Sequence, residues 1–435
     1  MRTTLAFRAG FLLALCAASP AAAQAPLEKS FSLDDAVRLA ELNNADILSA
    51  RQAEIIAEER VKEAEYLFLP EVGLQATATH YDSRYPFAPT GNDIILFPNT
   101  FLNQPGLGIP TGNIYSGYGY LTMSLYEGGR TLNTLRMAEA AQKQAFNNEE
   151  SVKMRVILET KKVFYNLLLA QQTAAAWADY AEQTEKLAAR SPKASWKYLE
   201  AQADMEYARI QASAAEHDLA LARLAFLKNL NLEMDTSFSV DGSLETKPVS
   251  MDIERAVLWA LELRPELQAQ TYQAQMDAIS VNLALARRSP TVFVAGDYGV
   301  TGFDFPLQLN NWDTTIGVRI PFTYDYWSQI KEKQAEQRQG DIQRSELQDR
   351  VRVEVRQAYE TLQYWQKEYP IRRDEYLKFQ ALYARLKKEK PQDTLDRIDS
   401  LKNLTEMRLS YLDAVTRHIL AEAELERAVG RSITP

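Results

Sequence analysis

Two windows of the chain alternate between apolar and polar or glycine positions with a period of two. In the first window the apolar residues at every second position are Val72, Leu74, Ala76 and Ala78 in one run, and Leu121, Met123 and Leu125 in another. In the second window they are Val292, Val294, Tyr298 and Val300 in one run, and Ile316, Val318, Ile320 and Phe322 in another. Runs of about nine to eleven residues with this period are typical of transmembrane β-strands. The pattern predicts β-hairpins at 71–126 and 291–323, although each strand alone also suits a soluble sandwich.

The parity also predicts which face of each strand meets lipid. Aromatic residues crowd the strand ends, as in an interfacial belt: Tyr81, Tyr85, Tyr115, Tyr118, Tyr126, Trp312, Tyr324, Tyr326 and Trp327. We expect Val72, Leu74, Leu121, Met123, Val318 and Ile320 to face lipid, and Gln75, Thr77, Thr122 and Arg319 to face the lumen.

Long stretches without helix breakers separate these windows. Residues 130–191 and 193–241 contain neither glycine nor proline, and 322–390 contains only Gly340 and Pro370. Because the stretches are rich in strong helix formers, they predict long helices at 129–190 and 325–390 and return helices at 192–230 and 391–430. Sixty helical residues extend over roughly 90 Å. A coiled-coil rod is the structural alternative.

The two halves of the chain form an internal repeat. Pro70 and Pro290 match at an offset of 220 residues, and Pro192 and Pro391 match at an offset of 199. Each half reads helix, strand, loop, strand, very long helix, sharp turn and helix. Four strands are too few to close a barrel, and a membrane sheet cannot keep an open edge. Other copies of the chain must therefore complete the sheet, with two copies as the minimum and three giving 12 strands.

Composition narrows the function further. The 435 residues carry a net charge of -9 with one cysteine and three histidines. The acidic balance disfavours nucleic-acid binding. No phosphate loop, paired-histidine metal motif or nucleophile elbow is present, so we expect no enzyme, no cofactor and no metal site.

The first residues are typical of a secretory signal peptide. Arg2 and Arg8 precede the apolar run Phe11–Cys16, and Ala21-Ala22-Ala23 offers a small-residue cleavage site. We therefore expect residues 1–23 to be removed. Lipid attachment at Cys16 is the alternative, but Leu15 is bulky where such sites prefer a small residue. No later window offers 18 uninterrupted apolar residues.

Several ordered motifs carry a family resemblance. They are Leu33-Asp34-Asp35-Ala36-Val37 followed by Asn43-Asn44-Ala45-Asp46-Ile47, its second copy Arg264-Pro265-Glu266-Leu267, the junction Ser124-Leu125-Tyr126-Glu127-Gly128-Gly129-Arg130, its counterpart Ile320-Pro321-Phe322, and the closing run Ala421–Gly430. Through their order, duplication and spacing, the sequence resembles the TolC-like outer-membrane efflux protein family over nearly the whole mature chain. Ala45 replaces the usual proline of the first motif.

The resemblance implies an α+β membrane protein. Three chains would form a homotrimer with a 12-stranded β-barrel, four strands per chain, in the outer membrane and a long periplasmic α-helical barrel below it. Residues 24–230 would form the first repeat, 231–262 an equatorial belt segment and 263–435 the second repeat.

The implied function is the exit duct of a tripartite efflux or type I secretion system for small molecules, metals or polypeptides. A periplasmic adaptor and an inner-membrane pump would be its partners. A periplasmic coiled-coil structural or adaptor protein without a pore is the alternative.

Two groups of residues are candidate sites. Asp396 and Asp399 resemble the family's aspartates that constrict the periplasmic end, and their i, i+3 spacing puts both on one helix face. The alternative is that Asp396 complements the helix N-terminus. If the helix begins at Pro391, however, Asp396 is the sixth residue and lies beyond the first turn.

The second group lies at the two periplasmic turns, where proline stands instead of the family's usual glycine. The turns carry the basic residues Arg190, Lys193, Lys387, Lys388 and Lys390, a candidate adaptor-docking tip. A solvated charge run that favours the helix dipole is the simpler interpretation of these five residues.

Overall fold

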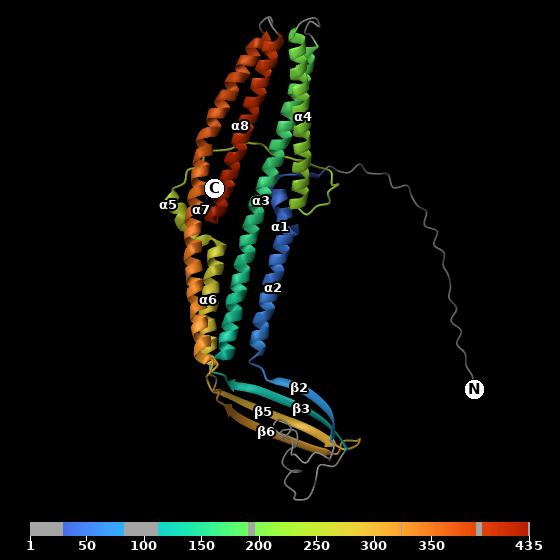
Figure 1. The fold of residues 1–435 in the computed structure, drawn as a ribbon, viewed down its shortest axis with the longest axis vertical. Helices are drawn as coiled ribbons and strands as arrows, with labels where there is room; N and C mark the ends of the chain where they lie inside the picture. The colour runs from blue at the N-terminus through green and yellow to red at the C-terminus, as the bar shows by residue number, and fades with distance from the viewer. Residues whose placement is uncertain (1–28, 82–111, 190–195, 323, 389–393, 434–435) are drawn as a thin grey trace, which may run out of the picture.

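The chain forms a long molecule with a curved β-sheet at one end and helix ends at the other (Figure 1). The computed structural model describes residues 29–81, 112–189, 196–322, 324–388 and 394–433. The expected signal peptide, Tyr85, Arg190, Lys193 and Lys390 therefore lie outside the described residues.

The elements repeat in the order expected from the sequence. The first half contains β1 (Lys29–Phe31), α1 (Leu33–Asn43), α2 (Ala45–Tyr66), β2 (Glu71–Tyr81), β3 (Gly112–Tyr126), α3 (Arg130–Ala188) and α4 (Trp196–Asn229). The second half contains β4 (Phe238–Val240), α5 (Ile253–Leu263), α6 (Pro265–Ala286), β5 (Thr291–Gly302), β6 (Leu309–Arg319), α7 (Tyr326–Lys388) and α8 (Thr394–Val429). Helices α1 and α5 both have 11 residues, and α2 and α6 both have 22. These equal lengths at an offset of 220 are what a duplication produces.

One strand is longer than the sequence suggested. Strand β3 has 15 residues, because it lies between β2 and β5 and pairs with each over a different part of its length. The described parts of the return helices begin at Trp196 and Thr394, and the prolines that were expected to open them, Pro192 and Pro391, lie outside the described residues. The division of the chain into a first repeat, a belt segment and a second repeat stays a prediction.

Local sequence explains where the first two helices begin. The Ser32 hydroxyl oxygen accepts a hydrogen bond from the Asp35 backbone N–H at 3.2 Å, and the Ser32 N–H donates to the Asp35 carboxylate at 3.3 Å. This capping box satisfies two N–H groups at the start of α1. The Asn44 side chain then accepts from the Asp46 N–H at 2.9 Å and starts α2. In the second half, Pro265 takes the first position of α6.

The sheet has the strand order β2-β3-β5-β6, and all its neighbours are antiparallel. Val72 lies opposite Leu121, and Val292 lies opposite Val318. The register places Val72, Leu74, Leu121, Met123 and Val318 on one face, and Gln75, Thr77, Thr122 and Arg319 on the other. The predicted parity is therefore consistent across all four strands. Ile320 follows the end of β6.

One face of this sheet is apolar and uncovered. Leu74 is 91% exposed and Ile316 is 73% exposed. Along the described chain, β2 and β6 each have one hydrogen-bonding edge without a partner strand. The sheet is therefore open at both edges.

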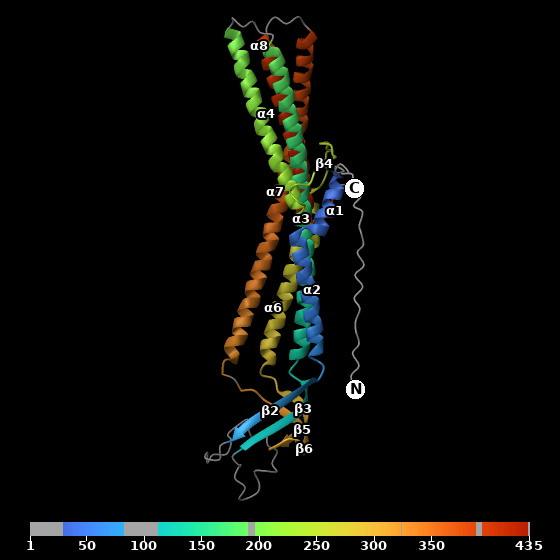
Figure 2. The same cartoon turned by 90° about the vertical axis from the view of Figure 1, so that its right-hand side faces the viewer.

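Each very long helix is accompanied by two shorter ones. Helices α3 and α7 run almost the whole length, with α2 and α6 beside them near the sheet and α4 and α8 beside them toward the far end (Figures 1 and 2). The core is concentrated at mid-height in two equivalent clusters. The first contains Phe31 of β1, Phe164 of α3 and Phe226 of α4 and also buries one face of α1. The second contains Val257 of α5, Val355 of α7 and Leu425 of α8. Of the described helices, none is both long enough and apolar enough to cross a membrane.

The corner between the paired helices is built differently in each half. In the first half the Asn44 amide donates to the Asn229 carbonyl at 3.3 Å, and the Asn229 amide donates to the Thr160 hydroxyl at 2.8 Å. In the second half Arg264 and Arg427 donate to the two oxygens of Glu354 at 2.7 and 2.6 Å. The first corner is thus held mainly by neutral groups, with one exposed ion pair between Asp46 and Arg155 at 3.0 Å, whereas the second has the buried Arg264 at its centre.

A belt crosses the helices at mid-height. Strands β1 and β4 pair in parallel, with Lys29 opposite Phe238. The chain then runs as an extended segment, residues 241–252, toward α5 (Figure 1). We call this segment the belt strap. Its Val249 N–H donates to the Gln366 side chain of α7 at 3.1 Å, and its Thr246 hydroxyl lies 2.6 Å from Nδ1 of His418 on α8. The strap therefore ties α7 to α8.

Two glycines connect the sheet to α3. Gly128 and Gly129 have φ angles of 63° and 80°, a region that favours glycine. A Cβ at Gly128 would also lie 2.1 Å from the Cβ of Ser289, whereas a Cβ at Gly129 would come no nearer than 3.6 Å to a side chain. Both positions of the junction therefore favour glycine because of their φ angles, but only Gly128 is also packed closely against another residue, Ser289.

We predict that Gly128→Ala destabilises the protein more than Gly129→Ala. The matched control Gly129→Ala should cost about 1–2 kcal/mol through backbone strain alone, and Gly128→Ala adds a steric clash. Thermal unfolding of both variants in detergent, followed by circular dichroism, measures the order. Equal midpoints for the two variants would contradict this packing.

Candidate functional site

The two candidate gate aspartates lie at the far end of the helices. The described part of α8 begins at Thr394, and Asp396 is its third described residue. Pro391, where the helix was expected to begin, lies outside the described residues. The position of Asp396 relative to the first turn of the helix therefore stays a prediction. Asp399 lies one turn further, and both side chains are exposed.

Neighbouring residues fix the orientation of this end of α8. Ile398 is fully buried against Ala188 of α3 and Ala201 of α4. The Arg397 guanidinium donates to the Leu386 carbonyl at the end of α7 at 3.2 Å. Since Ile398 faces into the bundle, the aspartates on either side of it face outward.

A third carboxylate, which the sequence analysis missed, belongs to the same region. Asp204 on α4 is half-buried, and burial followed by the nearby charge of Asp399 raises its pKa. Lys402 opposes this shift of the Asp204 pKa. Burial also raises the pKa of Tyr180 on α3 to about 12, and Asp204 and Asp399 act in the same direction. Asp204 of α4 and Asp399 of α8 therefore both raise the pKa of Tyr180 of α3, so three helices contribute to this region. Glu200 and Asp204, four residues apart on one helix face, were the available signal.

The predicted basic tip is described only in part. Lys387 and Lys388 lie in the last turn of α7 with exposed side chains, at the same end of the molecule as Asp396. Cations at this position are favourable at a helix C-terminus. Arg190, Lys193 and Lys390 lie outside the described residues. Adaptor docking at this tip stays a prediction.

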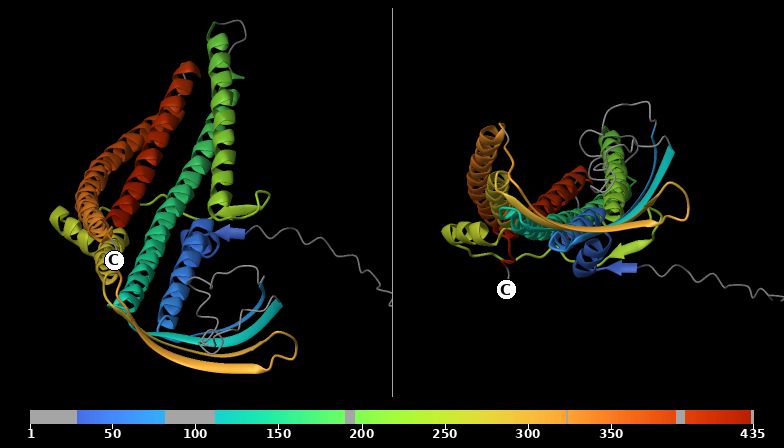
Figure 3. Two further views of the ribbon diagram at one scale, coloured as in Figure 1. Left: turned by 60° about the horizontal axis from the view of Figure 1, so that its bottom comes forward. Right: turned by 90° about the horizontal axis from the view of Figure 1, so that it is seen from below.

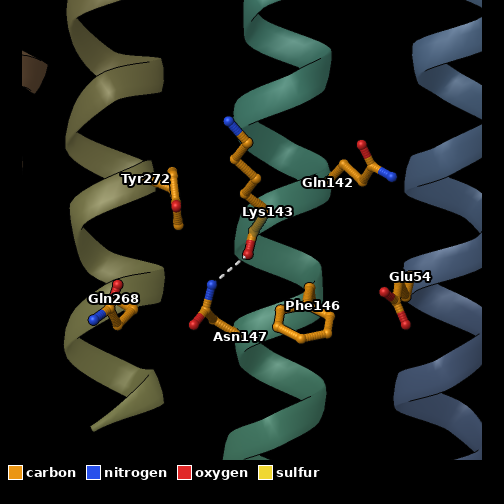
Figure 4. Close-up of a pocket in the computed structure, with 7 residues that line it drawn as sticks. All are labelled: Glu54, Gln142, Lys143, Phe146, Asn147, Gln268 and Tyr272. Carbon is orange, nitrogen blue, oxygen red and sulfur yellow. Dashed lines mark hydrogen bonds between the residues drawn. The ribbon is translucent and has the colours of Figure 1, made fainter. Parts of the chain in front are cut away.

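A recess of about 430 Å³ lies between α2, α3 and α6. Figure 4 shows Glu54 entering from α2, Lys143, Phe146 and Asn147 from α3, and Tyr272 from α6. The Asn147 amide donates to the Lys143 carbonyl at 2.7 Å, and the Lys143 ammonium lies 5.9 Å from the Tyr272 ring centre. These contacts are structural, and no nucleophile with an adjacent base lines the recess. Within the described ranges, no group of three or more metal-ligating side chains occurs.

A buried histidine anchors the belt strap. His418 is fully buried, with the Tyr369 ring centre 4.9 Å away. Its Nδ1 contacts Thr246, and its Nε2 has no hydrogen-bond partner among the residues that the structure describes. Burial lowers the pKa of His418 from its ordinary value of 6.5. The neutral ring is therefore the form that holds the strap.

The arrangement of an open, one-sidedly apolar sheet and very long helices defines the fold of an outer-membrane channel protomer. In solved structures it is similar to the Campylobacter jejuni CmeC outer membrane channel, with a TM-score of 0.78 and 14% identity over 92% of this chain and 85% of that one. The comparison with the Neisseria gonorrhoeae MtrE outer membrane channel gives a TM-score of 0.73 and 15% identity over 92% of this chain and 89% of that one. The comparison with the outer membrane protein VceC of Vibrio cholerae gives a TM-score of 0.72 and 14% identity over 92% of this chain and 97% of that one.

At such identities these structures establish the fold alone. Residues 36–232 match the family described as outer membrane efflux protein. The predicted resemblance to the TolC-like outer-membrane efflux protein family is thereby confirmed. No curated protein sequence matches the chain. The chain thus has the fold of the outer-membrane channels, and over residues 36–232 it resembles the outer membrane efflux protein family.

We predict that stability falls as the pH drops below about 6.5. The folded state lowers the pKa of His418, so the unfolded chain binds its proton first as the pH falls. The stability that the neutral His418 contributes is therefore fully present above about pH 6.5, and it is lost as the pH falls toward the lower pKa of this histidine in the folded state. Thermal unfolding at pH 7.5 and 5.5 should show a smaller pH effect in His418→Gln than in the wild type. The control is His217→Gln at an exposed site on α4, which should keep the wild-type pH dependence. An unchanged dependence in His418→Gln would contradict the role of this histidine.

Proposed function

We propose that the chain is one third of a homotrimeric channel-tunnel that serves as the exit duct of a tripartite efflux or type I secretion system. The observation that carries this proposal is the four-stranded sheet with one apolar face and two unpaired edges. An unpaired strand edge cannot remain within a lipid bilayer. The sheet therefore has to be closed by further copies of itself.

Strand direction supports closure by simple repetition. Strands β2 and β5 run one way, and β3 and β6 run the other. When β6 of one copy meets β2 of the next, the new pair is again antiparallel. Three copies then give 12 alternating strands, an even number within the range of membrane barrels. The polar face, with Gln75, Thr77 and Thr122, would line the lumen.

The helices carry complementary evidence along the two sides of the protomer. Helices α4 and α7 form opposite edges at the far end of the molecule (Figure 1). On α4, Leu199, Ile210 and Leu221 are 67%, 64% and 52% exposed and stand 11 residues apart. On α7, Ile342, Val353 and Tyr364 are 69%, 53% and 52% exposed with the same spacing, but they lie between the sheet and mid-height. Eleven residues make three helical turns, so each set forms one straight apolar stripe. The two stripes lie at different heights and do not meet each other, but each leaves an apolar side of the protomer that a neighbouring copy would cover.

The candidate gate belongs at the periplasmic end of this ring. Three copies would bring six carboxylates, from Asp396 and Asp399, to one level of the tunnel. Such a cluster attracts cations and disfavours full ionisation. The position of Asp396 at the start of α8 does not compete with this role, because its carboxylate stays exposed.

The partners follow from the same proposal. A periplasmic adaptor would dock at the tip near Lys387 and Lys388, and an inner-membrane pump would deliver small molecules, metals or polypeptides. A periplasmic rod without a pore accounts for the helices but leaves the apolar sheet face in water, which is unfavourable. The sheet therefore favours the channel over the rod.

The orientation of the sheet can be tested with two adjacent residues of β3. Leu121→Arg places a charge on the proposed lipid face and should cost about 2–4 kcal/mol, whereas Thr122→Arg on the lumen face should cost much less. Urea titration of the protein folded into vesicles measures both costs. The opposite order would reverse the proposed faces.

Channel recordings test the function itself. The purified mature protein should be a trimer in detergent and should form cation-preferring channels that multivalent cations block. The double variant Asp396→Ala with Asp399→Ala should weaken the preference and the block, because it removes six charges from the constriction. The control is Asp374→Ala with Glu375→Ala, two exposed carboxylates of α7.

Each result bears on a separate part of the proposal. A folded monomer in membranes would refute the trimeric channel. A trimeric channel with unaltered block in the aspartate variant would refute only the gate.

A further inference from the structure

An arginine–tryptophan–arginine cluster lies on the outer side of the belt. The Arg255 guanidinium carbon lies 4.6 Å from the Trp259 ring centre, and that of Arg431 lies 4.5 Å from it. Both arginines are exposed, and the adjacent Leu258 is 60% exposed. We call these four residues the cationic stack.

Backbone geometry brings the two halves of the stack together. Gly430 ends α8 with a φ of 83°, and the Arg431 N–H donates back to the Glu426 carbonyl at 3.2 Å. The Gly430 backbone packs against Arg264, because a Cβ added at Gly430 would lie 3.4 Å from the backbone nitrogen of Arg264. This turn directs Arg431 from the end of α8 across to α5. The stack is therefore built by two elements, α5 and the turn after α8, and does not depend on one flexible side chain.

The stack carries two positive charges without an anionic partner. Over the described part of the chain, neither Arg255 nor Arg431 makes an ion pair or a side-chain hydrogen bond. Their repeat equivalents in the first half are Asp35 and Leu232, and Leu39 stands where Trp259 does. Leu39 and Leu232 simply pack on the first core cluster. The second half has thus replaced an apolar contact with an unpaired cationic surface.

The opposite edge of the protomer presents the complementary surface at the same height. Helix α1 and the loop after α4 lie across the molecule from α5 (Figures 1 and 3). Asp34, Glu233 and Asp235 are exposed there, and none has an ion-pair partner within the described ranges. Leu42 and Met234 beside them are 66% and 53% exposed. The Asn231 side chain holds the loop to α1 by donating to the Asn43 carbonyl at 3.3 Å. We call these five residues (Asp34, Leu42, Glu233, Met234 and Asp235) the acidic edge.

We propose that, in the assembled ring, the cationic stack of each protomer docks on the acidic edge of the next and closes the belt. This inference rests on the proposed cyclic trimer. In a cyclic ring one edge of every copy meets the opposite edge of its neighbour. The contact continues, at mid-height, the interface already proposed for β2 with β6. Its opposite charges select the direction of assembly, and its exposed apolar side chains are covered.

Cysteine cross-linking in the full mature chain tests the contact. Leu258→Cys combined with Leu42→Cys should give dimers and trimers on denaturing gels after treatment with a short bis-maleimide. Each single-cysteine variant is the control and should stay monomeric on the same gel. The only natural cysteine, Cys16, lies in the expected signal peptide, so the background is low.

Charge exchange then tests the complementarity. Arg255→Glu with Arg431→Glu should lower the yield of cross-linked product by roughly tenfold. Adding Glu233→Lys with Asp235→Lys should restore most of it. The control Arg350→Glu, at an exposed site on α7, should leave the yield unchanged.

Different failures have different meanings. A conducting trimer without the 258–42 cross-link would overturn the belt contact and leave the channel proposal intact. A cross-link that forms only to another envelope protein would assign the stack to that partner and would equally overturn it. The absence of any trimer would refute the proposed function instead.

Discussion

The unpaired edges of the four-stranded sheet are the constraint on which the rest of the structure depends. Each edge presents a row of backbone N–H and C=O groups, and a bilayer offers no water to satisfy them. The chain therefore cannot be stable in a membrane as a single copy. The same requirement explains why the helices leave apolar stripes on both sides, since their neighbours are other chains. Burial within one protomer is densest at mid-height and continues between α3, α4 and α8 toward the far end.

The sequence was most informative where the signal is local. Alternating residues such as Val72 and Leu74 lie on one face because strand geometry forces it. The long breaker-free stretches became α3 and α7 because nothing in them interrupts a helix, although α7 contains Pro370. The repeat was visible because Pro70 and Pro290 each end a helix before a strand. These features require no knowledge of tertiary contacts.

Features that depend on contacts between distant residues were not predicted. Asp204 was missed because its proximity to Asp399 is produced by the packing of α4 against α8. The bond between Thr246 and His418 joins residues 172 positions apart. In the sequence, His418 was indistinguishable from an ordinary packing or surface residue.

The two unlike corners of the repeat have a mechanical consequence. The first is held mainly by amides and a hydroxyl, and its one ion pair, between Asp46 and Arg155, is exposed and therefore screened by salt. The second is held by Glu354 between Arg427 and the buried Arg264, which salt screens less. A ring of three chains would contain three corners of each kind in alternation. The two kinds differ in strength, so a tunnel built in this way would widen with threefold symmetry and not evenly around its circumference.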